Sequence, residues 1–293
     1  MVYHSDVGIL FYCSDVNNLK RKEVVKMTRE ELLRIIHSEP YDFLRTNPHL
    51  GKHLMFLTIG GSHAYGTNVE GSDVDIRGVA LNSKSDLLGM GDFEHHVDTA
   101  TDTTVYSINK AIWLLCSGNP NMLEQLGNPD ELVISYHPAT QLLLDNKNLF
   151  LSKRVIASFG GFANKMLEEA TRYGEFYNQM QKYGNVCELF KLKRKMSKTS
   201  MNMIRLYLML FDILEKGQII TNRSADRELL MKARTGGFQA ENGYVSHELK
   251  ELQKEYEKRL QYDKAHTMLP DSVDSKQIEE LVIAINEQSL KVA

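Results

Sequence analysis

A short apolar segment that ends in two glycines most constrains how this chain can fold. Residues 54–59 read Leu-Met-Phe-Leu-Thr-Ile and are followed by Gly60, Gly61 and Ser62. A run of this length bounded by glycine is typical of a strand buried in a sheet. Glycines at its end let the backbone approach a phosphate closely. If a helix begins at Ser62, its free N–H groups and the serine hydroxyl would face that phosphate.

Two aspartates follow the glycines on the next predicted strand. Asp73 and Asp75 flank Val74, and the chain then becomes apolar up to residue 81. Alternate residues of a strand point to the same face, so we expect the two carboxylates together and Val74 in the core. Magnesium prefers such oxygen ligands. An isolated Asp-x-Asp is usually a solvated loop, but its spacing from the glycine turn predicts a metal platform beside a phosphate cradle.

The remaining chain divides into a mixed part and a helical part. Thr28 and Glu31 have the spacing of a capping box and predict a helix start. Residues 103–108 are β-branched and predict a third strand, and helical periodicity dominates after residue 150. We therefore predict an α+β fold. Its parts are an N-terminal extension at 1–26, a catalytic domain at 27–150 and an all-helical domain at 151–293.

Composition narrows the possible partners. The formal net charge is −3, so any contact with nucleic acid must come from a local basic patch. The three cysteines are far apart and lack CxxC spacing, which argues against a disulfide framework or a zinc site. No apolar stretch is long enough to span a membrane. We expect a cytoplasmic protein without a membrane partner.

The glycine turn and the acid pair together resemble the signature of the polymerase beta nucleotidyltransferase superfamily. Residues 53–126 and 195–270 are similar to the branch of predicted nucleotidyltransferases that includes bacterial RNA-repair-associated polymerase-beta-like proteins. The resemblance implies a small mixed sheet with flanking helices, followed by helices. It rests on Gly60 to Gly66, Ser72 to Gly78, Asn119-Pro120 with Glu124, Ile204-Arg205-Leu206, Arg234 with Gly236, and Leu269-Pro270.

The resemblance implies transfer of a nucleoside monophosphate from an NTP to a hydroxyl, with release of pyrophosphate. Two divalent ions, Mg²⁺ or Mn²⁺, would serve this chemistry. An RNA or tRNA end is the favoured acceptor. The alternatives are a catalytically silent nucleotide- or RNA-binding protein of the same fold, and an enzyme that modifies a protein in a toxin–antitoxin or phage-defence pair.

The superfamily normally supplies a third carboxylate from a later strand. Asp102 directly precedes the strand predicted at 103–108 and is our choice for a third metal ligand and catalytic residue beside Asp73 and Asp75. As a ligand it could also help to take the proton of the attacking hydroxyl. Asp98 and Glu124 are the alternatives.

Basic residues of the helical half are candidates for substrate contacts. Most of the run from Lys191 to Lys198 is expected to be a solvated helix face. Lys198 and Arg205 match the branch and are expected to face the cleft and neutralise triphosphate or RNA. In the branch a histidine usually stands where this chain has Asn202.

Three further side chains near the motifs have two interpretations each, and four others are expected in the core. Arg77 either contacts phosphate or pairs with an acid. His63 either contacts nucleotide or is a polar residue at a helix start, and Tyr65 either packs or stacks on a base. Trp113 lies in an apolar segment and is expected in the core, as are Met201, Met203 and Met209.

Overall fold

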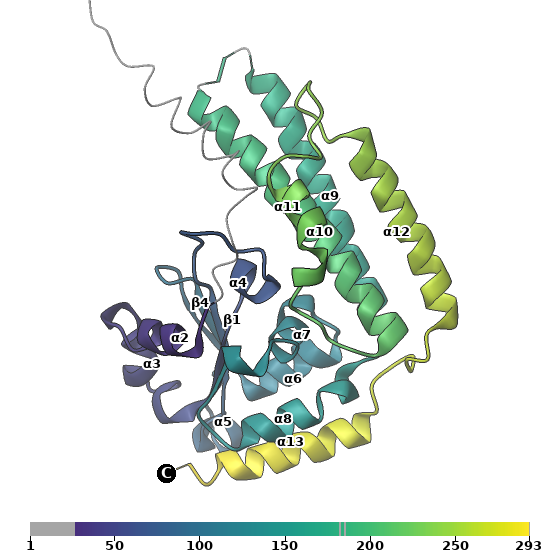
Figure 1. Ribbon diagram of the computed structural model, residues 1–293. Coiled ribbons are helices and arrows are strands. Elements are labelled where there is room, and N and C mark those ends of the chain that lie inside the picture. The colour runs from purple at the N-terminus through teal and green to yellow at the C-terminus, as the bar shows by residue number, and fades with distance from the viewer. Residues whose placement is uncertain (1–26, 182, 185, 293) are drawn as a thin grey trace, which may run out of the picture.

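A mixed five-stranded sheet forms the N-terminal part of the protein, and long helices form the C-terminal part (Figure 1). The computed structural model describes residues 27–181, 183–184 and 186–292. The extension predicted at 1–26 lies outside these residues. This arrangement confirms the α+β class and the order of a mixed sheet followed by helices.

The sheet has the strand order β3-β4-β2-β1-β5. β2 pairs with β1 in antiparallel and with β4 in parallel orientation. β5 and β3 are the edge strands, paired antiparallel to β1 and β4. All six residues of β1 are buried, because both faces of the sheet are covered there. The bounds are β1 Leu54–Ile59, β2 Ile76–Ala80, β3 His95–Asp98, β4 Thr103–Ser107 and β5 Val133–Ser135.

One face of the sheet is covered by short helices from the start of the described chain. The Thr28 capping box is present, and its helix α2 buries Leu32 and Ile36. These side chains form one core cluster with Leu57 of β1. The elements here are α2 Arg29–Ile36, η1 Glu39–Tyr41, α3 Phe43–Thr46 and η2 Gly51–His53.

The other core contains Phe56 of β1 and continues without a break into the helical part, where it includes Leu210. It therefore joins the sheet to the long helices. The connecting elements are α4 Gly61–Tyr65, α5 Lys84–Leu88, α6 Ile108–Cys116, α7 Pro120–Leu126, η3 Asp130–Leu132, α8 Ala139–Asp145 and η4 Lys147–Phe150.

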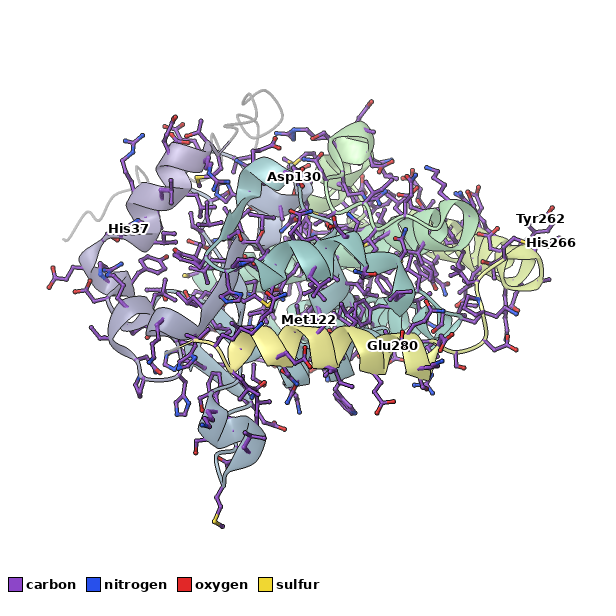
Figure 2. All side chains as sticks on the ribbon, turned by 90° about the horizontal axis from the view of Figure 1, so that it is seen from below. His37, Met122, Asp130, Tyr262, His266 and Glu280 are labelled. Carbon is purple, nitrogen blue, oxygen red and sulfur yellow. The ribbon has the colours of Figure 1, made fainter. Side chains whose placement is uncertain are left out.

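Two long helices, α9 and α10, pack along each other and form the spine of the helical part (Figure 1). α11 and α12 pack on α10, and the last helix, α13, returns to lie against α8 (Figure 1). Seen from below, α13 crosses the base of the molecule, with Glu280 on its outer side (Figure 2). The boundary near residue 150 stays a prediction. The bounds are α9 Arg154–Met180, α10 Val186–Lys216, η5 Ser224–Asp226, α11 Arg227–Arg234, α12 His247–His266 and α13 Ser275–Ser289.

The prediction that Trp113 lies in the core is wrong. α6 buries Ile108, Ala111, Ile112 and Leu115, whereas Trp113 lies on its outer face and is 63% exposed. At 100° per residue, position 113 points away from the stripe formed by the other four. The methionines predicted in the core, Met201, Met203 and Met209, are buried. Within the described ranges no helix is both long and apolar enough to cross a bilayer.

Candidate active site

Three chain segments meet at one edge of the sheet. β1 ends at this edge and is followed by Gly60, and β2 begins there after Asp75, because the two strands are antiparallel. β4 also begins there, directly after Asp102, because it runs parallel to β2. The N–H of Gly60 donates a hydrogen bond to the carbonyl of Asp75 at 2.7 Å. The topology therefore brings the glycine turn, Asp75 and Asp102 together.

The sequence pattern places the acid pair on a strand, but in the structure the two aspartates lie before the strand begins. β2 begins only at Ile76, which faces Ile59 of β1 and Thr103 of β4. Beyond Ile59 the chain turns into α4, so the residues before Ile76 have no β1 residue to pair with. Asp73 and Asp75 consequently precede the strand, and strand alternation does not determine where their side chains point.

The glycine turn is shaped by the carboxylate of Asp75. α4 begins at Gly61, one residue before the expected start, and Gly61 has a φ of +60°. A Cβ at Gly61 would lie 1.8 Å from Oδ2 of Asp75. Both the backbone conformation and the contact therefore require glycine. The close approach predicted for this turn is realised here by a side chain of the same protein.

The carboxyl groups of Asp75 and Asp102 lie within hydrogen-bonding reach of each other, and each affects the pKa of the other. Burial, followed by the hydrogen bond and the negative charge of Asp102, raises the pKa of Asp75 to about 6. Burial acts in the same direction on Asp102, but the hydrogen bond with Asp75 and the charge of Arg77 outweigh it and lower the pKa of Asp102. Two adjacent carboxylates repel when both are ionised. A proton or a cation relieves that repulsion.

The paired carboxylates fit a hard divalent cation. Mg²⁺ is commonly held by one or two carboxylates together with substrate phosphates. Within the described part of the chain no group of three or more His, Cys, Asp or Glu side chains is arranged to hold a metal ion. Among the described residues Asp73 forms no hydrogen bond or ion pair with Asp75 or Asp102. Its charge instead raises the pKa of Arg234.

The two alternative third acids have other partners. Asp98, at the end of β3, accepts hydrogen bonds from the backbone and the hydroxyl of Thr101. Glu124 is buried on α7, where it forms an ion pair with Arg205. Asp102 is thus the acid that the fold places beside Asp75.

Two cations flank the acid pair. Arg77 donates hydrogen bonds to the carbonyl of Asp102 and, at 3.1 Å, to its carboxylate. Of its two readings, the structure shows pairing with an acid. Lys198 lies on α10, and its charge lowers the pKa of both Asp75 and Asp102. The helical part therefore contributes positive charge at the edge of the sheet.

Arg205 and Tyr65 lie together in a buried cluster with Glu124. The guanidinium of Arg205 stacks 3.8 Å from the centroid of the Tyr65 ring, and the Tyr65 hydroxyl donates to Glu124 at 2.8 Å. Burial, above all, raises the pKa of Tyr65 far above its usual range. This cluster joins α4 to α7 and α10. A direct contact of Arg205 with phosphate stays a prediction, since in this structure it faces Glu124.

His63 ties α4 to the loop that leads to the acids. Its Nε2 lies 3.3 Å from the carbonyl oxygen of Ser72, while its buried Nδ1 has no hydrogen-bond partner in the described structure. His63 also borders a cavity of about 270 Å³ that is shared with Met27 and Ile35. A contact with nucleotide stays a prediction for His63, as for Ser62.

The structure adds residues that sequence reasoning missed. Arg234 of α11 donates a hydrogen bond to the carbonyl of Thr67 at 2.6 Å. The N–H of Arg223 donates to the carbonyl of Tyr65 at 2.8 Å. Both bonds hold the chain around α4 from the helical part. The sequence signal for these residues was the match of Arg234 to the RNA-repair-associated branch, and that match did not indicate what Arg234 does.

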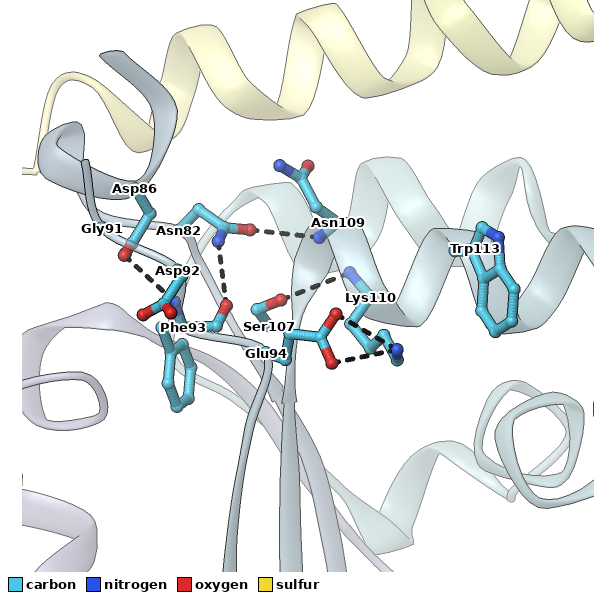
Figure 3. A pocket seen from close by; sticks show the side chains of 10 residues that line it. All are labelled: Asn82, Asp86, Gly91, Asp92, Phe93, Glu94, Ser107, Asn109, Lys110 and Trp113. Atoms are coloured by element: carbon cyan, nitrogen blue, oxygen red, sulfur yellow. Dashed lines mark hydrogen bonds and ion pairs between the residues drawn. The ribbon is translucent and has the colours of Figure 1, made fainter. Parts of the chain in front are cut away.

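A larger cavity lies at the opposite edge of the sheet, where the strands β2 and β4 end. It measures about 670 Å³ and is lined by Asn82, Ser107, Lys110 and Trp113, among others (Figure 3). Asn82 and Ser107 lie at or just beyond the ends of β2 and β4, whereas the acids precede the starts of these strands. Size therefore does not identify the site here; the paired acids and the glycine turn do.

A mixed sheet with a strand–glycine–helix turn and paired acids at one edge defines a protein of the nucleotidyltransferase type. Residues 25–284 match the model of the RNA repair pathway DNA polymerase beta family, and the chain belongs to this family. This match confirms the resemblance found in the sequence.

A phage protein is also similar to this chain. It is an uncharacterized 38.9 kDa protein encoded in the nrdC–mobD intergenic region of Enterobacteria phage T4. The two are 28% identical over 128 residues, which cover 39% of this chain and 37% of the phage protein.

Proposed function

We propose that this protein is a metal-dependent nucleotidyltransferase that transfers a nucleoside monophosphate from an NTP to a hydroxyl of RNA or of a tRNA end. The observation that carries the proposal is the proximity of Asp75 and Asp102, which affect each other's pKa, beside the Gly60–Gly61 turn. In the reaction the acceptor oxygen forms a bond to the α-phosphorus, and the bond to the bridging oxygen of pyrophosphate breaks. Family membership supports this type of activity.

Each residue has a defined task in this proposal. Asp75 and Asp102 would hold divalent ions, with Asp73 two residues before Asp75 as a further carboxylate, and such ions would neutralise charge at the triphosphate and lower the pKa of the acceptor hydroxyl. The backbone of Gly60, Gly61 and Ser62 receives phosphate oxygens. Asp102, whose side chain is 66% exposed, is the acid that an acceptor can reach, and its carboxylate takes the hydroxyl proton.

Positive charge on α10 supports a nucleic-acid acceptor. The chain as a whole carries a net charge of −3, but exposed Lys191, Lys195 and Lys198 follow one side of this helix and lead to the acid pair. Phosphate backbones are attracted to such local rows of charge. This row supports RNA over a protein acceptor.

The proposal is tested by labelled transfer. The protein is incubated with each α-labelled NTP, Mg²⁺ or Mn²⁺, and total RNA or cell lysate, and the labelled product is identified. Asp75→Asn and Asp102→Asn are expected to lose at least about 10²-fold in rate, because they remove charge at the reacting centre. Asp98→Asn is the matched control, since it removes a nearby carboxylate that contacts Thr101 instead, and it should keep its rate.

Each outcome separates the candidate functions. Label in RNA that depends on Asp75 and Asp102 supports the proposal, whereas label in protein would replace RNA with a protein acceptor. Nucleotide binding without transfer under all conditions would refute the enzyme and favour the silent binding protein. A loss in Asp98→Asn equal to that in Asp102→Asn would remove Asp102 from its role.

A further inference from the structure

Three arginines of the helical part lie near the loop that carries Asp73, because Arg234 bonds to this stretch and is close enough to Arg194 and Arg227 to be affected by their charges. Arg227 and Arg234 are seven residues apart on α11, so they lie on the same face of this helix. Arg194 lies on α10, which packs against α11, and is four residues from Lys198 on the same helix face. Arg234 is anchored by its hydrogen bond to the carbonyl of Thr67. Two helices thus direct positive charge to one place.

The positive charges of these three arginines, the arginine cluster, are only partly compensated by negative charge. Neither Arg194 nor Arg227 forms an ion pair or hydrogen bond in the described part of the protein, and Arg234 donates to a neutral carbonyl. Burial, and then the charges of Arg194 and Arg227, lower the pKa of Arg234, while Asp73 offsets this only in part. Like charges held close together are unfavourable when opposite charge compensates them only in part. Such an arrangement is relieved by a polyvalent anion.

The anion that best fits the cluster is a phosphate group. Guanidinium groups bind phosphate oxygens through pairs of parallel hydrogen bonds, and several arginines can share one group. Along α10, Arg194 is followed by Lys198, whose charge acts on Asp75 and Asp102. A row of cations therefore leads from the cluster to the acid pair.

We propose that Arg194, Arg227 and Arg234 form a phosphate-binding site that holds one phosphate of a substrate whose reacting end lies at Asp75 and Asp102. The identity of that substrate rests on the proposed function, but the binding of phosphate does not. The phosphate belongs either to the triphosphate of an NTP or to the backbone or end of a single-stranded RNA. The two sources share the same chemistry, and binding experiments distinguish them.

Arg234 is unsuitable as the first variant, because its bond to Thr67 also supports the loop. Arg194 and Arg227 make no such bond, so the double variant Arg194→Ala/Arg227→Ala tests the site. The matched control is Lys250→Ala/Lys258→Ala, which removes the same charge from exposed positions of α12. Binding is measured on full-length protein with tripolyphosphate, with a non-hydrolysable NTP analogue and with fluorescent single-stranded RNA.

The arginine variant is expected to lose at least about tenfold in affinity for one of these ligands, while the control stays near the wild type. Loss for tripolyphosphate and the NTP analogue assigns the site to the triphosphate. Loss for RNA alone assigns it to the acceptor, and the dependence of log affinity on log salt should then become shallower by about 0.7, because one phosphate contact is lost. Unchanged affinity for all three ligands would overturn the proposal.

Thermal unfolding gives a readout that a structural role would not produce. In buffer without phosphate the arginine variant should melt at or slightly above the wild-type temperature, because repulsion is removed. The stabilisation by the bound ligand should be lost. A lower melting temperature with unchanged affinity would make these arginines structural and refute the site. A wild type that binds phosphate through them but transfers no label would refute the proposed function and leave this inference standing.

Discussion

Gly61→Ala should displace the carboxylate of Asp75 and abolish transfer while leaving the protein folded. A Cβ at this position would lie 1.8 Å from Oδ2 of Asp75, whereas ordinary contacts begin at 3.4 Å, so the carboxylate must withdraw by about 1.6 Å. The backbone cannot follow easily, because the carbonyl of Asp75 accepts a hydrogen bond from Gly60. A displacement of about 1 Å in a reacting group can cost on the order of 10²-fold in rate. We therefore expect at least that loss.

Gly71→Ala is the matched control for this substitution. Gly71 also has a positive φ, of +77°, but nothing lies within 4 Å of a Cβ at this position. Both variants carry the backbone strain of about 1–2 kcal/mol, which should lower the melting temperature by a few degrees. Only Gly61→Ala adds the collision. Transfer of label from an α-labelled NTP and thermal unfolding are measured on both proteins.

Two results would contradict the reasoning behind this pair. If Gly61→Ala transfers label within a few-fold of Gly71→Ala, the position of the Asp75 carboxylate is not critical for the reaction. If both variants lose transfer equally, backbone strain in this region and not the collision with Asp75 explains the loss.

Two further predictions concern parts of the molecule away from the acid pair. Arg205→Ala should lower the free energy of unfolding by about 3–5 kcal/mol, because it leaves the carboxylate of Glu124 buried without its partner. Replacing Glu124 with Leu in the same protein should recover part of this loss, as measured by urea titration. If the losses of the two substitutions simply add, the pairing of Arg205 with Glu124 is contradicted. Trp113, the single tryptophan, should be quenched readily by acrylamide in the native protein, because it is 63% exposed, and a shielded, blue-shifted emission would refute its position.

Local patterns in the chain were sufficient to predict several elements. The apolar run at 54–59 forms β1, and the β-branched run that begins at Thr103 forms β4. The Thr28 capping box starts α2. These predictions succeed because apolar periodicity and capping depend on residues close in sequence. They also include the α+β class, since the change from mixed to helical periodicity near residue 150 is itself a local pattern.

The edge strands were not predicted. β3 has an alternating exposed and half-buried pattern with two histidines, and β5 has three residues. Short edge strands carry a weak apolar signal, because one side of the strand faces solvent instead of a neighbour. Their pairing becomes visible only when the neighbouring strand is in place.

The glycine turn, the position of Asp75 a short way after it along the chain, and the α+β class were all determined by the sequence, because each follows from a pattern of residues close in sequence. Only the tertiary structure decided that Asp102 lies beside Asp75, that Glu124 is occupied by Arg205, and that Trp113 is exposed. The reason is that these facts depend on which strands and helices become neighbours. The parallel pairing of β2 with β4 brings the two acids together although they are far apart in sequence, and no periodicity within either segment encodes that pairing.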